Sequence, residues 1–303
     1  MSFLGYKSRV ECGDIATIYL ASNKVYVQRI EKGKVFQTIY GALRHEDLIG
    51  KQYGTKVHCK KGWVYLLHIT PELWTQNLPH RTQILYTTDI SLITTMLYLK
   101  PGSVVVEAGT GSGSLSHSIL RTISPNGHLY TFDFHEERVQ KALKEFIDHG
   151  LDKLVSIKAR DVCKQGFDLC SVADAVFLDL PNPWEAIPFA VTAMKSKDYY
   201  REDSFNSRLF VLFIRHLLRV KVNTVIASLA GSRICCFSPC IEQVHKTCVT
   251  LREHHFEDID TIECVLKPFE MRRLPLTQFD CDKLPVNETD VSTASKFVFN
   301  EIF

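Results

Sequence analysis

The chain has 303 residues, of which 45% are hydrophobic and 23% are charged, and its formal net charge at pH 7 is +2. This composition is typical of a globular protein with one large domain or two unequal ones. It excludes a globally cationic nucleic-acid-binding protein, so any RNA contact must come from local basic patches. The N-terminus has no signal-peptide core, and basic residues interrupt the apolar run 209–229. We therefore expect an intracellular protein without a membrane span.

The ten cysteines follow no metal-binding pattern. Cys235, Cys236, Cys240 and Cys248 cluster in the sequence, but the chain has no C-x-x-C pair. Buried free thiols in a reducing compartment are the favoured interpretation, with a zinc site as the alternative, and we expect no metal.

Residues 1–70 predict a small β domain. Short β-rich runs separated by glycine turns cover residues 15–20, 24–28, 35–40, 55–58 and 62–67. Their spacing indicates a small barrel or sandwich. This domain is either a binding or assembly module or a structural cap.

A polar and aromatic connector follows, and it leads from Thr70 to Tyr86. Asp89 is expected to cap the next helix, whose apolar residues Ile90, Ile93 and Leu97 share one face.

The stretch 104–116 reads as a buried strand, a glycine turn and the start of a helix. Glycines let the backbone approach a ligand closely, and a helix start offers free N–H groups, so this arrangement suits a nucleotide-type cofactor. A dinucleotide fingerprint requires G-x-G-x-x-G, and serine stands where its third glycine belongs. The pattern present is acidic-x-G-x-G-x-G, formed by Glu107, Gly109, Gly111 and Gly113. It resembles the first motif of class I S-adenosylmethionine (SAM) methyltransferases, although a glycine turn in another α/β protein is an alternative.

Strands and helices alternate after this motif. Strands are expected at 128–134, 155–161, 174–180 and 233–238, and helices at 136–149, 184–194 and 241–252. This alternation predicts a doubly wound, Rossmann-like α/β domain over residues 71–303, with a mostly parallel sheet. Ligands of such sheets bind at the carboxyl ends of the strands.

Acidic residues stand at three of these strand ends. Asp133 can accept both hydroxyls of an adenosine ribose. Asp161 is placed to meet an adenine edge, with a turn-forming role as the alternative. Asp179 ends a buried apolar strand beside two prolines and Trp184, where a carboxylate needs a partner and an aromatic ring can stack on a planar base.

Several long segments resemble the catalytic-subunit family of eukaryotic tRNA (adenine-58-N1) methyltransferases. The resemblance covers residues 1–194 and 232–273, and its matching segments are 50–57, 71–74, 78–86, 107–116, 177–184 and 237–244. It implies a SAM-dependent enzyme that methylates N1 of adenine 58 in the T-loop of tRNA. It also implies a nuclear heterotetramer of two catalytic and two related non-catalytic subunits.

The resemblance and the glycine motif together imply the site residues. Asp179 matches the family's essential aspartate, and Asp133 stands where the family usually has glutamate. The predicted cofactor residues are Leu85, Glu107, Gly109, Gly111, Ser112, Gly113, Ser114, Leu115, Asp133, Arg138, Asp161, Val162 and Asp179. The predicted substrate residues are His80, Arg81, Pro181, Ser238, Pro239 and Arg272.

Two regions depart from the family. An insert at 199–231 is either an RNA or partner contact or a translated intron, and its residues 208–219 fit an amphipathic helix. Residues 274–303 also match poorly, although 296–302 fit a final strand. The alternatives for the whole chain are a non-catalytic tRNA-binding partner subunit and a nicotinamide-dependent oxidoreductase.

Overall fold

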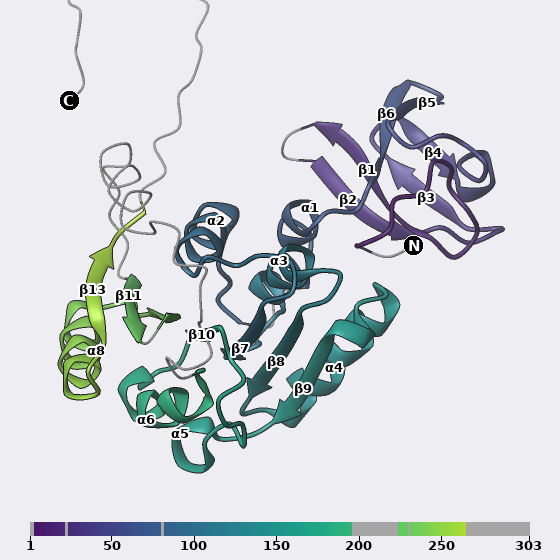
Figure 1. The fold of residues 1–303 in the computed structure, drawn as a ribbon. Helices are drawn as coiled ribbons and strands as arrows, with labels where there is room; N and C mark the ends of the chain where they lie inside the picture. Colours follow the sequence, from purple (N-terminus) through teal and green to yellow (C-terminus); the bar gives the residue numbers. More distant parts are fainter. Residues whose placement is uncertain (1–2, 22–23, 80–81, 196–223, 230, 265–303) are drawn as a thin grey trace, which may run out of the picture. The chain divides into compact units, whose positions relative to one another are not determined.

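The structure is a computed structural model that describes residues 3–21, 24–79, 82–195, 224–229 and 231–264 (Figure 1). These residues all belong to one compact unit, Met1–Leu266. The domain boundary expected near residue 70 therefore stays a prediction. The predictions that fall outside the described residues concern His80, Arg81, Arg272, the helix at 208–219 and the strand at 296–302.

The N-terminal part is antiparallel β structure, as the β-rich runs predict. A four-stranded sheet has the order β2-β1-β6-β5, and β3 pairs with β4 in a separate hairpin. The bounds are β1 (Ile15–Ala21), β2 (Lys24–Arg29), β3 (Val35–Thr38), β4 (Gly41–Arg44), the 3-10 turn η1 (His45–Asp47), β5 (Thr55–Cys59) and β6 (Gly62–His68). Ile18, Val64 and Leu66 are fully buried in a core of their own between these strands. The sequence did not predict β4, which contributes only four residues to the hairpin.

Two helices connect this part to the second sheet. In α1 (Pro71–Thr75), the Thr70 hydroxyl accepts a hydrogen bond from the Leu73 N–H at 3.3 Å. The next helix, α2 (Thr87–Met96), has Tyr86 as its N-cap, so the prediction that Asp89 caps it is wrong. Asp89 lies in the first helical turn, where the positive end of the helix dipole stabilises a carboxylate.

The second sheet has seven strands in the order β13-β11-β12-β10-β7-β8-β9. The five strands from β12 to β9 are parallel, and β11 and β13 are antiparallel additions at one edge. The strand bounds are β7 (Val104–Ala108), β8 (His128–Asp133), β9 (Val155–Ala159), β10 (Ala175–Leu178), β11 (Thr224–Leu229), β12 (Ser232–Phe237) and β13 (Glu257–Ile262). The predicted doubly wound α/β fold is confirmed.

Helices cover both faces of this sheet (Figure 1). Alternate residues of one strand face opposite sides, so Val105 joins the core on one face and Val106 the core on the other. The helix bounds are α3 (Ser114–Ile123), α4 (Glu136–Asp148), the 3-10 turn η2 (Asp152–Leu154), α5 (Val162–Gln165), α6 (Pro183–Ala193) and α8 (Ile241–Glu253). Helices α2, α3 and α4 pack on the Val105 face, and α6 and α8 pack on the Val106 face. Within the described residues, no helix is long and apolar enough to cross a membrane.

Two local differences from the sequence analysis concern the sheet. Strand β9 ends at Ala159, so Asp161 is the N-cap residue of α5 and not the last residue of the strand. Residues 224–229, which the sequence analysis places inside the insert, form β11 between β12 and β13. Strand β11 was not predicted, because residues 224–229 were assigned to an insert without a counterpart in the family.

Candidate active site

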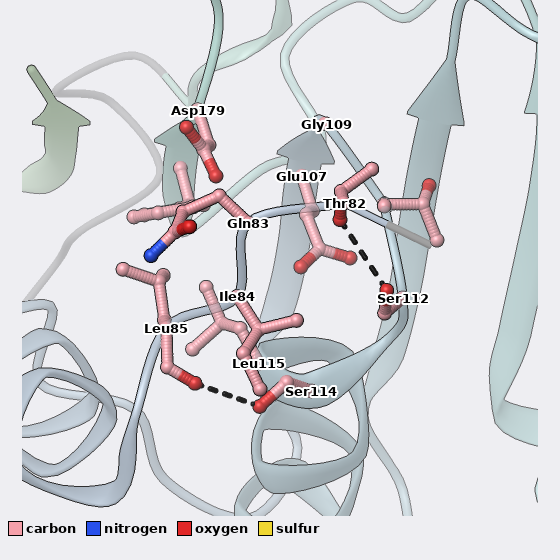
Figure 2. Close-up of a pocket in the computed structure, with 13 residues that line it drawn as sticks. Thr82, Gln83, Ile84, Leu85, Glu107, Gly109, Ser112, Ser114, Leu115 and Asp179 are labelled. Carbon is pink, nitrogen blue, oxygen red and sulfur yellow. Dashed lines mark hydrogen bonds between the residues drawn. The ribbon is translucent and has the colours of Figure 1, made fainter. Parts of the chain in front are cut away.

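A pocket lies at the carboxyl ends of β7 and β10 (Figure 2). This is where a doubly wound sheet places a ligand. The pocket is lined by Thr82, Gln83, Ile84, Leu85, Glu107, Gly109, Thr110, Gly111, Ser112, Ser114, Leu115, Phe177 and Asp179. They come from the connector before α2, from the end of β7, from the glycine turn with the start of α3, and from the end of β10 with the residue after it.

The glycine turn has no room for side chains at two positions. Gly109 has φ +97°, and a Cβ atom there would lie 2.3 Å from the backbone oxygen of Asp179. Gly111 has φ +54°, and a Cβ atom there would lie 2.8 Å from the hydroxyl of Thr82. The turn therefore passes between the end of β10 and the connector, and only glycine permits that close approach.

Glu107 is buried beneath the turn, where two hydroxyl groups hold one of its oxygens. The hydroxyls of Ser116 and Thr131 each donate a hydrogen bond to Oε2, at 2.6 Å in both cases. Thr110 in turn donates to Thr131 at 2.6 Å, because the hydrogen of Thr131 is already used. Burial, together with the nearby charges of Asp179 and Asp133, raises the pKa of Glu107 to about 7. A positive charge in the pocket would favour the ionised form.

Asp133 is the last residue of β8, and its carboxylate accepts a hydrogen bond from the glycine turn. The N–H of Gly111 donates to Oδ2 and the N–H of His135 donates to Oδ1, at 2.9 Å in each case. The guanidinium of Arg138 lies 3.8 Å from Oδ1. Each carboxylate oxygen has two lone pairs, so both can still accept a hydrogen bond from a ligand diol.

Asp179 follows directly after β10, and its N–H donates to the carbonyl of Ala108 at 2.8 Å. Desolvation by burial raises the pKa of its carboxyl to about 6. The loop that follows is held by α8, because the Gln243 amide donates to the Pro181 carbonyl at 2.9 Å. The ammonium group of Lys246 lies 4.9 Å from the centre of the Trp184 ring.

The predicted residues fall into three groups. Those that line the pocket are Leu85, Glu107, Gly109, Gly111, Ser112, Ser114, Leu115 and Asp179. Those beside it are Gly113, the N-cap of α3, and Asp133 with Arg138. Asp161 and Val162 lie at the start of α5, after β9, and Pro181, Ser238 and Pro239 lie after β10 and β12. Their individual roles stay predictions.

One predicted substrate residue has an unusual environment. The Ser238 side chain is fully buried, and its hydroxyl has no hydrogen-bond partner among the described residues. A buried hydroxyl without a partner costs free energy unless a ligand or water completes it.

Sequence reasoning missed five lining residues: Thr82, Gln83, Ile84, Thr110 and Phe177. Thr82, Gln83 and Ile84 belong to the segment 78–86, which the sequence analysis singled out for its resemblance, but only Leu85 was assigned to the cofactor. Thr110 and Phe177 sit within the glycine turn and the buried strand, and no pattern in either distinguishes a lining position.

The pocket fits a ligand that carries a positive charge beside an adenosine group. Its lining includes the carboxyl groups of Glu107 and Asp179, and among the described residues no Lys, Arg or His side chain lines it. Asp133 adds a diol acceptor at the neighbouring strand end. This charge and hydrogen-bonding pattern matches S-adenosylmethionine, with its sulfonium, amino group and ribose.

Comparison with known proteins identifies the relatives of this chain. Residues 62–205 and 219–300 match the family described as "tRNA methyltransferase complex GCD14 subunit". A tRNA (adenine(58)-N(1))-methyltransferase catalytic subunit, TRM61, from Cryptococcus neoformans is 43% identical over 265 residues, which are 86% of this chain and 54% of that protein. The corresponding subunit from Schizosaccharomyces pombe is 42% identical over 289 residues, 92% of this chain and 70% of that protein. The chain thus spans about half the length of the Cryptococcus relative.

Solved structures share the fold. A SAM-dependent O-methyltransferase from Thermotoga maritima has a TM-score of 0.64 and 26% identity, over 81% of this chain and 79% of that one. The tRNA (m1A58) methyltransferase TrmI from Aquifex aeolicus has a TM-score of 0.60 and 19% identity, over 81% of this chain and 82% of that one. At that identity, the second likeness supports the fold alone.

Proposed function

Because the chain belongs to the family of tRNA methyltransferase complex GCD14 subunits, we propose that it is a catalytic subunit that methylates N1 of adenine 58 in tRNA. The methyl donor in this proposal is S-adenosylmethionine. The proposal is supported by the catalytic-subunit relatives, which are about two-fifths identical over most of this chain. The structural observation that carries it is Asp179, a half-buried carboxylate that lines a glycine-turn pocket.

The proposed reaction needs no general base. The in-plane lone pair of adenine N1 forms the new N–C bond, the S–C bond of the donor breaks, and its electron pair stays on sulfur. No proton has to leave before the attack. The adenine becomes cationic, so a carboxylate that accepts a hydrogen bond from the exocyclic N6 amine stabilises the charge as it develops. Asp179 is the group proposed for this role, because it lines the pocket and directly precedes the loop 180–184.

The protein groups around the pocket would bind and orient the donor. Asp133 is placed to accept the ribose hydroxyls, and Glu107 supplies negative charge under the glycine turn. The backbone of the turn can approach the ligand closely because Gly109 and Gly111 have no side chains. Positioning of the two reactants would then supply most of the remaining catalysis.

We further propose that the chain works in the nucleus, with a related non-catalytic subunit, in a heterotetramer of two copies each. The description of the family as subunits of a methyltransferase complex supports a partner. A net charge of only +2 also supports it, since much of the tRNA-binding surface would then belong to the partner.

Two other functions are less well supported. A non-catalytic tRNA-binding subunit would have no need for both a glycine turn of this kind and the Asp179 carboxylate in the same pocket. A nicotinamide-dependent oxidoreductase would require the dinucleotide glycine pattern, which the turn at 109–113 lacks. Thermal protection by SAM, and not by NAD, would separate the last alternative from the proposal.

The test is methyl transfer from radiolabelled SAM to unmodified elongator tRNA, with this chain co-expressed with the non-catalytic subunit. The proposal predicts one methyl group per tRNA at N1 of the T-loop adenine. The matched variant is Asp179→Asn, which keeps the shape of the side chain and removes its charge. We expect its turnover to fall by roughly 10²–10³-fold, the range for loss of one stabilising group in a transition state. A folded wild-type complex that binds SAM but transfers no methyl group would refute the proposal.

A further inference from the structure

A chain of hydrogen bonds links three separate segments next to the pocket, and Figure 2 shows its bond between Ser114 and Leu85. The hydroxyl of Ser114, the first residue of α3, donates to the carbonyl oxygen of Leu85 at 2.9 Å. The hydroxyl of Thr75, at the end of α1, lies 2.9 Å from the same Ser114 oxygen. All three residues are almost completely buried, with exposed fractions of 1% for Thr75, 5% for Ser114 and 7% for Leu85.

The direction of the chain follows from the number of hydrogens. A serine hydroxyl has one hydrogen, and Ser114 uses it toward Leu85. The remaining hydrogen bond must therefore come from Thr75, which donates to the lone pair of Ser114. Thr75 thus restricts the rotation of the Ser114 hydroxyl and keeps its hydrogen directed at the Leu85 carbonyl.

Leu85 is the last of four consecutive residues, Thr82–Leu85, that line the pocket. We call these four residues the connector wall. At its other end, the Thr82 hydroxyl lies 3.3 Å from the Ser112 hydroxyl (Figure 2). The wall is therefore linked to the glycine turn at Thr82 and to the start of α3 at Leu85. Since the turn and the wall both line the pocket, these links hold the two segments against each other.

We propose that Thr75 is a positioning residue that sets the affinity for the cofactor by holding the connector wall against the glycine turn through Ser114. Thr75 itself is absent from the lining of the pocket and acts through its neighbour. This inference rests on the proposed use of SAM. It goes beyond that proposal because it assigns a cofactor-affinity role to a residue outside the pocket, on a helix that precedes the methyltransferase motif.

The test compares Thr75→Val with wild type in the co-expressed complex. Valine keeps the volume of threonine and removes the hydroxyl, so the Ser114 oxygen loses its donor. Loss of one hydrogen bond of ordinary net strength predicts a roughly fivefold rise in the SAM dissociation constant, measured by calorimetry. The KM for SAM should rise similarly, and kcat at saturating SAM should stay within about twofold, because uniform binding is what is lost. Amide hydrogen exchange in residues 83–85 should become faster.

Two further variants make the result decisive. Thr75→Ser keeps the hydroxyl and should restore the wild-type affinity. Thr122→Val removes a hydroxyl that donates within α3, to the Ser118 carbonyl at 2.8 Å, and should leave the affinity unchanged. A Thr75→Val complex with a lower melting temperature and an unchanged SAM affinity would show a merely structural role and overturn the inference. Absence of SAM binding in the wild-type complex would instead overturn the proposed function.

Discussion

At the scale of single residues, the pocket contains two carboxyl groups whose pKa values are raised by burial. Asp179 and Glu107 both lie where desolvation disfavours the charged carboxylate, so their pKa values rise to about 6 and about 7. The free energy needed to ionise such a carboxyl group lowers the stability of the folded chain, and an uncharged side chain would avoid it. Groups with pKa values shifted in this way cluster at functional sites. A cationic ligand would reverse the effect for both groups.

The pKa of Asp179 predicts how the reaction depends on pH. Its carboxyl must be ionised to stabilise a cationic adenine, and in the free protein it is half-ionised near pH 6. We expect kcat/KM to rise about tenfold for each pH unit below 6 and to level off above 7. The check is a pH profile of methyl transfer with both SAM and tRNA below saturation, so that the profile reports the pKa of the free protein. A flat profile from pH 5 to 8 would contradict the assigned role.

The same pKa predicts a change in stability. The carboxyl of Asp179 has a higher pKa in the folded state than its usual value of 3.8, so folding is favoured at low pH and loses stability as the pH rises through 6. Asp179→Asn removes this cost. We expect its free energy of unfolding above pH 6 to exceed that of wild type by roughly 1–3 kcal/mol, as measured by urea denaturation. The gain should disappear near pH 4, and a variant that is less stable at pH 8 would contradict the argument.

At the scale of elements, β11 is the least expected part of the sheet. It lies between β12 and β13 and pairs with both of them in antiparallel register. Val225 and Ile226 are buried on opposite faces, with exposed fractions of 0% and 2%, and each joins one of the two sheet cores. These contacts place residues 224–229 inside the packed domain, although the sequence analysis grouped them with the insert.

The burial of β11 predicts the effect of shortening its side chains. Ile226→Ala should lower the free energy of unfolding by about 2–4 kcal/mol, because it removes buried methyl groups and leaves a cavity. Chemical denaturation of the complex measures this. Ser228→Ala, at a half-buried position of the same strand, is the matched control and should stay within about 0.5 kcal/mol. Equal stability of all three proteins would show that this segment does not contribute to the folded core.

At the scale of the whole described chain, a buried histidine pair joins distant segments. His117 Nδ1 lies 2.6 Å from the carbonyl of Gly113, which can only accept, so this nitrogen carries the hydrogen. His117 Nε2 therefore accepts from His149 Nδ1 at 2.8 Å. The rings of Phe3 and Trp74 pack against both histidines. The N-terminal segment, α1, α3 and the end of α4 thus meet behind the glycine turn.

This cluster predicts sensitivity to acid. Burial lowers the pKa of His149 to about 2, so below pH 6.5 the unfolded chain binds a proton that the folded chain does not. His149 thus contributes stability that is complete above pH 6.5 and falls by about 1.4 kcal/mol per pH unit below it. Glu107 and Asp179 oppose this trend, since their raised pKa values favour folding at lower pH.

The two trends can be separated by substitution. His149→Asn keeps a donor near the Nδ1 position and cannot titrate, so the stability difference from wild type should shrink steadily as the pH falls from 6.5 to 4.5. Urea denaturation at several pH values measures it. Phe146→Leu, a neighbouring buried position without a titratable group, should instead lower stability by the same amount at each pH. Parallel curves for His149→Asn and wild type would contradict the prediction.

Sequence alone determined the α/β class and most of the pocket. The alternation of strands and helices, with glycines at 109, 111 and 113, predicts a doubly wound sheet. Hydrophobic periodicity and the positions of glycines are local properties, so they can be read from the sequence alone. Asp133 and Asp179 were identifiable for the same reason: each follows a recognisable strand, and parallel strands bring their carboxyl ends to one edge.

Tertiary structure decided the features that depend on segments far apart in the chain. The connector wall, the link from Thr75 through Ser114 to Leu85 and the histidine pair all join residues from separate elements. No local pattern marks a threonine at a helix end or a histidine within an apolar face as a long-range donor. The position of β11 depends likewise on pairing with β12 and β13. Packing and hydrogen bonding in the folded chain decide which distant residues contact one another, and these contacts cannot be read from a single sequence.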